Sequence, residues 1–507
     1  MSTSARRSLV RCARPDRNAR LRLLHKLASR AVGLDLAFPL ATGRQGRRIY
    51  LDSTASTLML DVVRDALDKY GPYYSNTHSL VHFGARISTA EYGWAHEMVL
   101  RFVNADPETY TSFFVGSGTT GGMNRVARTL AGLRPERDVV ITTIMEHHSN
   151  DLPHRKHAKE VVHIPAAMGT QSAVDLSQLE RALDRHRGRV NYVTVTGVSN
   201  VTGIINPVHD IAALAHRHGA MIVVDGAQMV AHLPVKMGGH SDPARDLDIL
   251  VFSGHKVYAP GSPGAVVARK DLFSKLEPEE VGGGMVEDVW IDRYTATAML
   301  PDREEAGTPN IPGAIGLAAS LCALDTVGMD LVYEEECALI AHAMERLKVI
   351  EDVVIYGDGD FKRCERAGAV SFNIRGIHHA LTAAVLNDYF GIAVRNECFC
   401  AHPYVREIIT EMLAAEDDAL SAEDLEALAE LQRGMVRASL GLYTTEADID
   451  ALTAALDDIS ARRDFYAGQY EETGAGDFRH KTYRFEPQRY FSIEGAVGAW
   501  FGRPAAQ

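Results

Sequence analysis

The chain has 507 residues, of which 46% are hydrophobic and 23% are charged. This length and composition suffice for a sizeable buried core, and they predict a large enzyme-sized protein with two domains and extensions. The net charge of −13 argues against nucleic acid as a main partner, because a phosphate backbone is bound by a basic surface.

Location and redox state follow from two further features. No apolar run reaches the ~18 residues that a membrane-spanning helix needs, and no secretory signal is recognisable. We therefore expect no membrane association and a cytoplasmic location. The six cysteines do not form a disulfide framework in so long a chain, and reduced thiols are expected.

Residues 1–34 are strongly basic, with eight Arg and one Lys against a single Asp. An Arg-rich, acid-poor start is similar to a transit peptide. The four leucines between residues 21 and 27, together with Val32, also fit an amphipathic helix that packs on the body. The packed helix is the preferred interpretation.

From about residue 48 to 270, short apolar runs alternate with helix-like segments. Strands are predicted at residues 110–115, 139–143, 190–196, 221–224 and 249–252, and helices at 121–130, 176–186 and 208–218. This alternation predicts an α/β fold with a mostly parallel sheet covered by helices. Functional residues of such sheets lie in the loops at the carboxyl ends of the strands.

Changes of pattern divide the chain into four parts. They are a basic arm over residues 1–47, a large domain over 48–315, a smaller α+β domain over 316–465, and an aromatic, Gly-rich extension over 466–507. The smaller domain contains an acidic, helix-like insert at about 404–434. The extension is expected to pack on the body or on a neighbouring subunit.

A polar segment follows each of the five predicted strands, at residues 116–122, 146–150, 199–203, 225–228 and 253–256. These segments are expected to converge at one edge of the sheet. The first is Gly-rich and contains Thr119 and Thr120, but it lacks the Lys-Ser/Thr of a nucleotide P-loop. It suits a single phosphate at a helix N-terminus, and a plain turn is the alternative.

Asp225 and Lys256 each end an apolar run. Asp225 is either a cap or turn former or the charge partner of a protonated ring nitrogen. A pocketed lysine such as Lys256 can lose its proton and form a Schiff base with an aldehyde. A lysine for the aldehyde, an aspartate for the pyridinium and a phosphate cup are together what pyridoxal 5′-phosphate needs.

Histidines cluster at His147, His148, His154 and His157, which raises the question of a metal site. No carboxylate or cysteine companion lies at a diagnostic spacing, so no metal is predicted. Stacking on an aromatic cofactor would need only one imidazole.

Three further residues are candidates for chemistry. Cys398 and Cys400 could be small buried hydrophobes or part of a metal site. Their loop contains a proline, with Arg395 upstream and His402 just after, which favours a partly exposed thiol beside cationic neighbours. Arg437 lies in a mostly apolar run, where it needs a carboxylate partner from the protein or from a substrate.

Taken in order, these pieces resemble the fold-type I pyridoxal-phosphate enzymes, and specifically the cysteine desulfurase/selenocysteine lyase branch of the class V aminotransferase family. The resemblance covers about four hundred residues, from Tyr50 to the helix after Tyr443. Its most specific motifs are MEHH (145–148), VSNVTG (198–203), VDGAQ (224–228), FSGHK (252–256), EAGTP (305–309) and VRAS (436–439).

The resemblance implies the fold-type I architecture and pyridoxal 5′-phosphate as cofactor. Lys256 would link to the cofactor aldehyde, His147 would stack on the pyridine ring and Asp225 would pair with the ring nitrogen. Gln228 would bond the ring hydroxyl. The phosphate would be held by Thr119, Thr120, Ser253 and His255, with Thr308 contributed by the second subunit of a homodimer.

The resemblance also implies the substrate site and the reaction. Arg437, Asn200 and Arg395 would grip the carboxylate of L-cysteine or a related amino acid, and His78 would line the pocket. Cys400 stands at the place of the family's persulfide-forming cysteine. The expected reaction converts L-cysteine to L-alanine and leaves on Cys400 a sulfur that a partner protein could accept.

Departures from the family pattern keep alternatives open. Gly121 replaces a usual Glu, Ala259 replaces a usual Gly, and thirty-six residues separate Cys400 from Arg437. The alternatives are transamination, epimerisation or selenocysteine lysis with the same cofactor, or a catalytically silent sulfur carrier or scaffold. The sequence does not say whether Cys398 assists or resolves the persulfide.

Overall fold

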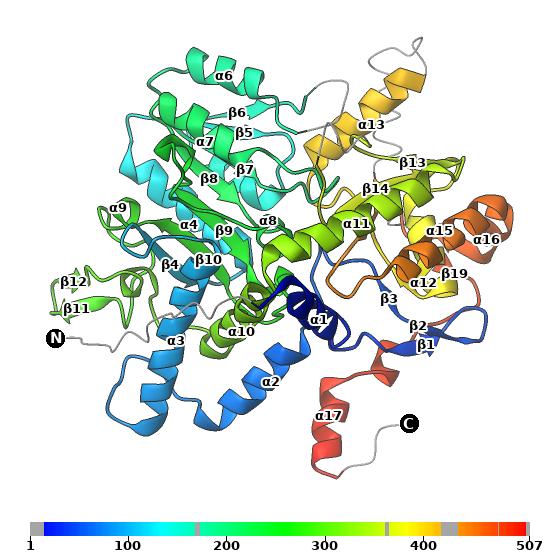
Figure 1. Cartoon of the computed structure of the whole chain (residues 1–507), viewed down its shortest axis with the longest axis horizontal. Helices are drawn as coiled ribbons and strands as arrows, with labels where there is room; N and C mark the ends of the chain where they lie inside the picture. The colour runs from blue at the N-terminus through cyan, green and yellow to red at the C-terminus, as the bar shows by residue number, and fades with distance from the viewer. Residues whose placement is uncertain (1–14, 168–172, 360–364, 417–433, 475, 503–507) are drawn as a thin grey trace.

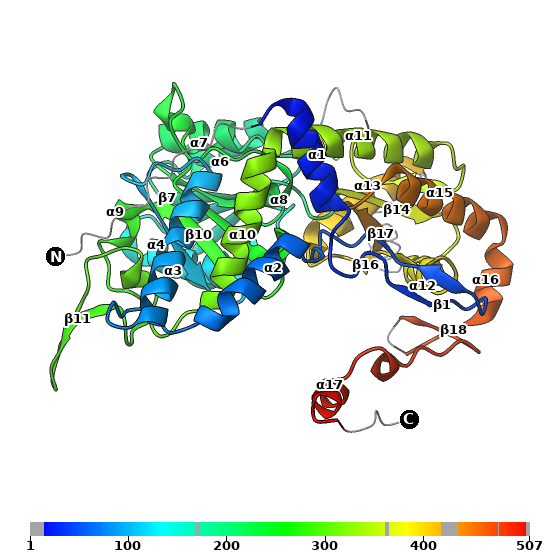
Figure 2. The same cartoon turned by 60° about the horizontal axis from the view of Figure 1, so that its bottom comes forward.

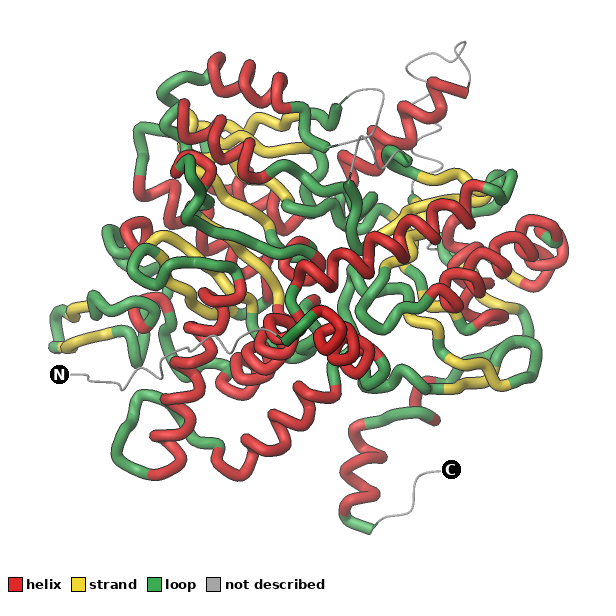
Figure 3. The backbone as a smooth tube through the Cα atoms, in the orientation of Figure 1, coloured by secondary structure: helices red, strands yellow, loops and turns green. Residues whose placement is uncertain are grey.

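The computed structural model describes residues 15–167, 173–359, 365–416, 434–474 and 476–502. These residues form two lobes with a sheet in each, and helices surround both sheets (Figures 1 and 3). The first fourteen residues and most of the predicted acidic insert, 417–433, lie outside the described residues.

The larger lobe is built on a seven-stranded sheet with the order β4-β10-β9-β8-β7-β5-β6. The pairings from β9 through β8, β7 and β5 to β6 are parallel, whereas β10 is antiparallel to β4 and β9. The predicted mostly parallel sheet is therefore confirmed. Its strands are β4 (Tyr110–Val115), β5 (Val139–Thr143), β6 (Glu160–Ile164), β7 (Val190–Thr196), β8 (Met221–Asp225), β9 (Ile249–Ser253) and β10 (Gly264–Arg269).

Helices cover both faces of this sheet, which explains why β4, β5, β7, β8 and β9 are buried at every residue. In β9, Leu250 and Phe252 enter one core, and Ile249 and Val251 enter the core on the opposite face. The first core packs against α3 (Phe83–Phe102), α6 (Leu176–Arg185), α7 (Val208–Arg217) and α10 (Ile311–Val327), and the second against α4 (Gly118–Leu133) and α9 (Lys270–Phe273).

The N-terminal segment forms a helix, α1 (Arg17–Ala28), that lies against α10 and α11 (Met329–Lys348). Arg20 ties it down, because its Nε donates to the Val327 carbonyl at 2.6 Å and its Nη2 pairs with Asp330 at 2.6 Å. Leu24 is buried beneath the helix. Residues 17–28 thus have the packed helix that was preferred for the arm, and Val32 lies beyond its end.

The smaller lobe has an antiparallel sheet with the order β13-β14-β17-β16. Its strands are β13 (Val353–Ile355), β14 (Ala369–Ile374), β16 (Arg395–Glu397) and β17 (Met435–Ser439), and α12 (His379–Phe390) and α15 (Glu446–Ala461) cover it. In the β16–β17 pairing, Arg395 lies directly opposite Arg437. A further pair of short strands links distant parts of the chain, because β3 (Ile49–Tyr50) pairs in parallel with β15 (Ile392–Ala393).

The segment after β16 begins as a helix, α13 (His402–Glu416), which covers the first part of the predicted insert. The extension continues from α16 (Arg463–Gln469) into a hairpin of β18 (Tyr470–Glu472) and β19 (Phe478–His480), where buried His480 bonds the Tyr389 hydroxyl at 3.0 Å. The last described helix, α17 (Ile493–Trp500), stands away from the body (Figures 1 and 2). All of its residues are at least partly exposed.

No single helix among the described residues is long and apolar enough to cross a bilayer. The helices α10 and α11, which meet at an 80° bend, have together the length and composition of a broken span.

Candidate active site

A pocket of about 380 Å³ lies at the carboxyl ends of the strands of the large sheet. All five predicted polar segments line it, and residues 395–397, 399–400 and Arg437 of the smaller lobe close it. The pocket brings together twelve of the fourteen predicted site residues: Thr119, Thr120, His147, Asn200, Asp225, Gln228, Ser253, His255, Lys256, Arg395, Cys400 and Arg437.

The two remaining residues, His78 and Thr308, do not line this pocket in the described part of the chain. His78 faces a separate cavity of about 700 Å³, which Tyr92 and Asp302 also line. Thr308 accepts a hydrogen bond from Asn76 Nδ2 at 3.3 Å. The assignment of Thr308 to the pocket of a second subunit stays a prediction. His78, which was expected to line the substrate pocket, does not line it within one chain.

The start of α4 forms one wall of the pocket. The Thr119 amide donates to Ser253 Oγ at 2.7 Å, and the Thr119 hydroxyl lies 2.8 Å from the same oxygen. Gly118 has φ +59°, and a Cβ added there would lie 2.5 Å from Ser253 Oγ. Glycine is therefore needed for the helix N-terminus to approach β9 so closely, which places helix amides and hydroxyls at one end of the pocket.

Lys256 follows β9 in a short helical turn, is half-buried and lines the pocket. Burial lowers the pKa of its amine from 10.5 to about 8, while the nearby Asp225 carboxylate acts in the opposite direction. Burial also raises the pKa of Asp225, against the hydrogen bond from the Ala227 amide at 2.9 Å and the charge of Lys256. The apolar run of β9 thus delivers an amine that is partly neutral near physiological pH.

His147 lies after β5 and is held as a neutral imidazole. Burial, with the charge of Lys256 second, lowers its pKa to about 3. The Ser149 amide donates to its Nδ1 at 3.1 Å, which leaves the ring proton on Nε2. A neutral ring held at one edge is suited to stacking on an aromatic group.

Glu146 precedes His147 in the polar segment after β5 and does not itself line the pocket. It is buried, and burial raises its pKa to about 8. Its Oε1 accepts from the Thr143 hydroxyl at 2.6 Å and the Thr196 amide at 3.1 Å, and its Oε2 accepts from Asn150 Nδ2 at 2.6 Å. Glu146 therefore ties together the ends of β5 and β7.

Another histidine of the cluster, His154, has structural partners. His154 is fully buried between the Tyr192 hydroxyl at 2.8 Å and Asn150 Oδ1 at 3.0 Å. Among the residues that the structure describes, no group of three or more His, Cys, Asp or Glu side chains is placed to hold a metal ion.

Arg437 and Arg395 approach the pocket from the smaller lobe. The Arg437 side chain is 3% exposed, and its Nη1 donates to the Asn200 carbonyl at 2.7 Å. Asp52 lies between the arginines, with its Oδ2 2.9 Å from Arg395 Nη2 and its Oδ1 3.6 Å from Arg437 Nη2. Arg437 was expected to need a carboxylate from the protein or from a substrate. The protein supplies one, Asp52, at a distance longer than a hydrogen bond.

Cys400 presents an exposed free thiol at the pocket. Its loop is held by its backbone, since the Cys400 carbonyl accepts from the His148 amide at 2.7 Å and the Phe399 carbonyl from Asn200 Nδ2 at 2.7 Å. Both residues are left-handed, with φ of 56° and 50°, a conformation that costs energy outside glycine. Cys398 is buried instead.

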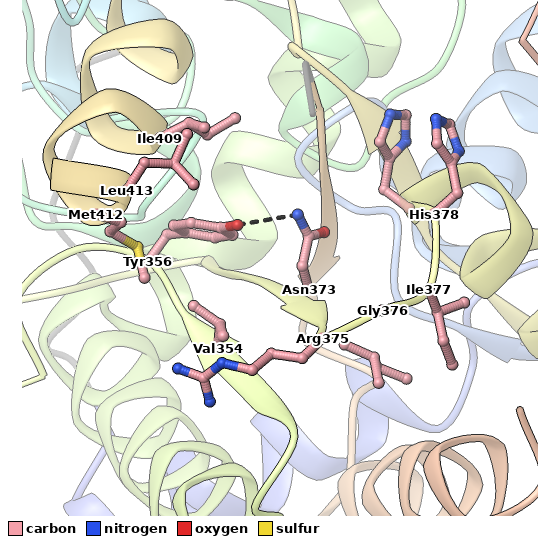
Figure 4. Close-up of a pocket in the computed structure, with 12 residues that line it drawn as sticks. Val354, Tyr356, Asn373, Arg375, Gly376, Ile377, His378, Ile409, Met412 and Leu413 are labelled. Carbon is pink, nitrogen blue, oxygen red and sulfur yellow. Dashed lines mark hydrogen bonds between the residues drawn. The ribbon is translucent and has the colours of Figure 1, made fainter. Parts of the chain in front are cut away.

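A second cavity, of about 440 Å³, lies in the smaller lobe between β14 and α13 (Figure 4). Tyr356 and Asn373 join across its floor through a 2.9 Å hydrogen bond, with Met412 of α13 and Arg375 nearby. None of the predicted site residues lines it. The pocket at the strand ends is therefore the candidate active site.

A first prediction follows from the environment of Lys256. In the cofactor-free protein its labelling by acetic anhydride is expected to rise with pH around a midpoint near 8, because burial lowers its pKa. Asp225→Asn should move the midpoint lower, since the carboxylate raises that pKa. Peptide mass spectrometry measures both, with the exposed Lys275 as internal reference. A midpoint at the ordinary lysine value would contradict the buried environment.

The donor set of the pocket fits pyridoxal 5′-phosphate. The N-terminus of α4 with Thr119, Thr120 and Ser253 offers amides and hydroxyls to a phosphate, and the close approach at Gly118 shapes this cradle. Lys256 offers an amine to an aldehyde, and buried Asp225 offers a carboxylate to a ring nitrogen.

Comparisons with known proteins agree with this geometry. The family model described as aminotransferase class V matches residues 49–452, and this family is pyridoxal-phosphate-dependent. A probable cysteine desulfurase of Halalkalibacterium halodurans is 35% identical over 416 residues, which are 81% of this chain and 92% of that protein. A cysteine desulfurase of Serratia proteamaculans is 34% identical and covers 81% and 93% of the two chains.

Solved structures give the same result. The apo cysteine desulfurase of Thermococcus onnurineus NA1 superposes with a TM-score of 0.70 at 31% identity, over 82% of this chain and 95% of that one. The cysteine desulfurase CsdA of Escherichia coli, in an S-sulfonic acid form, gives 0.66 at 29% identity, over 81% and 94% of the two chains. The chain therefore belongs to the class V aminotransferase family, with the fold of its pyridoxal-phosphate-dependent members.

Proposed function

We propose that the protein is a cysteine desulfurase, which converts L-cysteine to L-alanine and retains the sulfur as a persulfide on Cys400. The observation that carries the proposal is the exposed thiol of Cys400 in the same pocket as Lys256 and the buried Arg437. The relatives that cover most of the chain bear the name of this activity. A thiolate at this position can accept the substrate sulfur, a step that transamination does not include.

The side chains divide the work of this reaction. Pyridoxal 5′-phosphate, when bound, supplies an aldehyde that captures the substrate amine and a ring that accepts electrons. Lys256 takes the proton from the substrate Cα, because its lowered pKa leaves part of the amine neutral. Asp225 holds the proton on the ring nitrogen, and Arg437 with Asn200 orients the carboxylate.

The sulfur step balances without a further reagent. The Cys400 thiolate attacks the substrate sulfur, and an S–S bond forms while the Cβ–S bond breaks. The electron pair of the broken bond stays on Cβ, which takes a proton to complete alanine. The enzyme keeps Cys400 as a persulfide, whose outer sulfur a partner protein or a small thiol can accept.

The experiment that tests this function is product analysis of the wild-type holoenzyme with L-cysteine. Alanine should form, and without an added thiol Cys400 should become one sulfur atom heavier by mass spectrometry. A keto acid in place of alanine would show an aminotransferase, and a change of stereochemistry alone would show an epimerase. An inert holoenzyme would favour the carrier or scaffold alternative.

We also infer that the protein is a homodimer. Leu80 and Val81 are exposed on the segment before α3 and Phe83 is exposed at its first position. Trp290 and Ile291 are exposed on the hairpin of β11 (Val286–Val289) and β12 (Tyr294–Ala296). Exposed apolar groups gathered in this way are typical of interfaces. His78 and Thr308, which lie outside the pocket of their own chain, belong to the same part of the lobe.

Charge on this surface is expected to separate the subunits. Val81→Asp with Phe83→Asp should halve the mass measured by light scattering, because both side chains, 85% and 71% exposed, would carry charge into an apolar interface. Val349→Asp, at a 77% exposed position on the smaller lobe, is the matched control and should stay dimeric. A double variant that remains a dimer would contradict this interface.

Location is part of the same proposal. Cys400 has to remain a free thiol to attack the substrate sulfur, and it is free in the structure. Such a thiol persists in a reducing compartment, which favours the cytoplasm.

A further inference from the structure

We propose that Asp52 is a resident carboxylate, which occupies the binding groups of the substrate carboxylate and gives them up when an amino acid binds. The proposal concerns the carboxylate of any α-amino acid. It rests on the proposed function only for the choice of L-cysteine as that amino acid.

The backbone fixes Asp52 opposite the two arginines. It follows β3, which pairs with β15, and it bridges to Ser439 at the end of β17. Arg395 and Arg437 lie across from each other in the neighbouring β16–β17 ladder. Three strands from distant parts of the sequence thus place one carboxylate against two guanidinium groups through backbone pairing.

The two pairings of Asp52 differ in quality. Arg395 engages it through two donors, Nη2 to Oδ2 at 2.9 Å and Nε to Oδ1 at 3.4 Å. Arg437 Nη2 reaches Oδ1 only at 3.6 Å. The Arg395 side chain is 51% exposed and can change partners at the cost of a surface ion pair, whereas Asp52 is 13% exposed.

Arg437 is left with unused binding capacity. A guanidinium has five N–H donors, and among the described residues Arg437 Nε has no hydrogen-bond partner although it is buried. Its Cζ lies 4.6 Å from the centre of the ring of Phe399, the residue before Cys400. Burial lowers its pKa to about 10, and Asp52 is the largest influence that opposes this shift. A second carboxylate would satisfy donors that Asp52 does not reach.

The negative charge of Asp52 therefore has two opposite effects on the site. It offsets one of two neighbouring positive charges while the pocket holds no substrate, which stabilises buried Arg437. It also repels an incoming carboxylate and occupies the donors of Arg395. Removal of its charge therefore distinguishes the proposal from a purely structural role by the sign of the effect. If Asp52 competes with the substrate carboxylate, removal of its charge should tighten substrate binding. If Asp52 only holds the arginines in place, the same change should weaken binding.

The test is the dissociation constant of the holoenzyme for L-alanine, followed by the absorbance change of the bound cofactor. Alanine carries the carboxylate but has no sulfur to lose, so binding is measured without turnover. Asp52→Asn should bind alanine about fivefold to tenfold more tightly than wild type. Ethylamine, which lacks the carboxylate, should bind both proteins equally. Asp52→Glu, which keeps the charge, should return affinity for alanine toward the wild-type value.

Controls make each outcome decisive. Asp61→Asn removes a carboxylate that pairs with Arg30 and Arg64 and does not line the pocket, and it should leave both dissociation constants unchanged. Weaker or unchanged alanine binding by Asp52→Asn would overturn the proposal, and so would equal shifts for alanine and ethylamine. If wild type bound alanine but made none from L-cysteine, the proposed function would fail while the assignment of Asp52 would still be tested.

Discussion

Lys256→Ala is expected to abolish turnover of L-cysteine, with kcat lower by about 10⁴-fold or more. In the proposed mechanism the lysine supplies both the amine for the cofactor aldehyde and the base for the substrate Cα. Its pKa of about 8 makes it effective in the second role near neutral pH. Removal of one buried amine therefore removes two functions at once, and no other lysine lines the pocket among the described residues.

The measurement is alanine formation from L-cysteine by purified holoenzyme and variant, with cofactor content recorded for each. Lys275→Ala, which removes an exposed lysine paired with Asp271, is the matched control and should retain full activity. Added methylamine should restore part of the lost rate, because a small amine can enter the space that the side chain leaves. Full activity in Lys256→Ala would exclude Lys256 from the chemistry.

Three fully buried strands of the large sheet could be predicted in full from the sequence, whereas two other strands could not. β4, β5 and β7 are buried at every position and consist mainly of β-branched and aromatic residues, so they were predicted to the residue. β6 and β10 were missed. β6 is only half-buried at the sheet edge, and β10 follows a Gly/Pro-rich turn whose composition indicates a loop.

The site shows a similar division. Residues after the strands, such as Asp225 and Lys256, were predictable because parallel strands end at a common edge. Cys400 and Arg437 were assigned from the family resemblance, and the small antiparallel sheet is what brings them to that edge. The pairing of Asp52 with Arg395 spans 343 residues and leaves no local signal. Glu146 likewise acquires its bridging role only from the register of β5 and β7.

Cys400→Ala is expected to lower alanine formation from L-cysteine by about 10²-fold to 10³-fold, because no thiolate then accepts the substrate sulfur. The cysteine lies at the end of a loop anchored by backbone hydrogen bonds to His148 and Asn200, which do not depend on its side chain. The substitution should therefore leave the pocket and the cofactor absorbance unchanged. Mass spectrometry should find no persulfide on the variant.

A second substrate, L-cysteine sulfinate, distinguishes a chemical role of the Cys400 thiol from a structural role. L-cysteine sulfinate can release its sulfur as sulfur dioxide with the electron pair left on Cβ, so it needs no thiolate. Cys400→Ala should turn it over at nearly the wild-type rate. Cys337→Ala, at a half-buried thiol outside the pocket, is the matched control and should behave as wild type with both substrates. Equal losses with both substrates would mean that Cys400 supports the pocket and does not accept sulfur. Buried Cys398, which does not line the pocket, is then not expected to substitute for it.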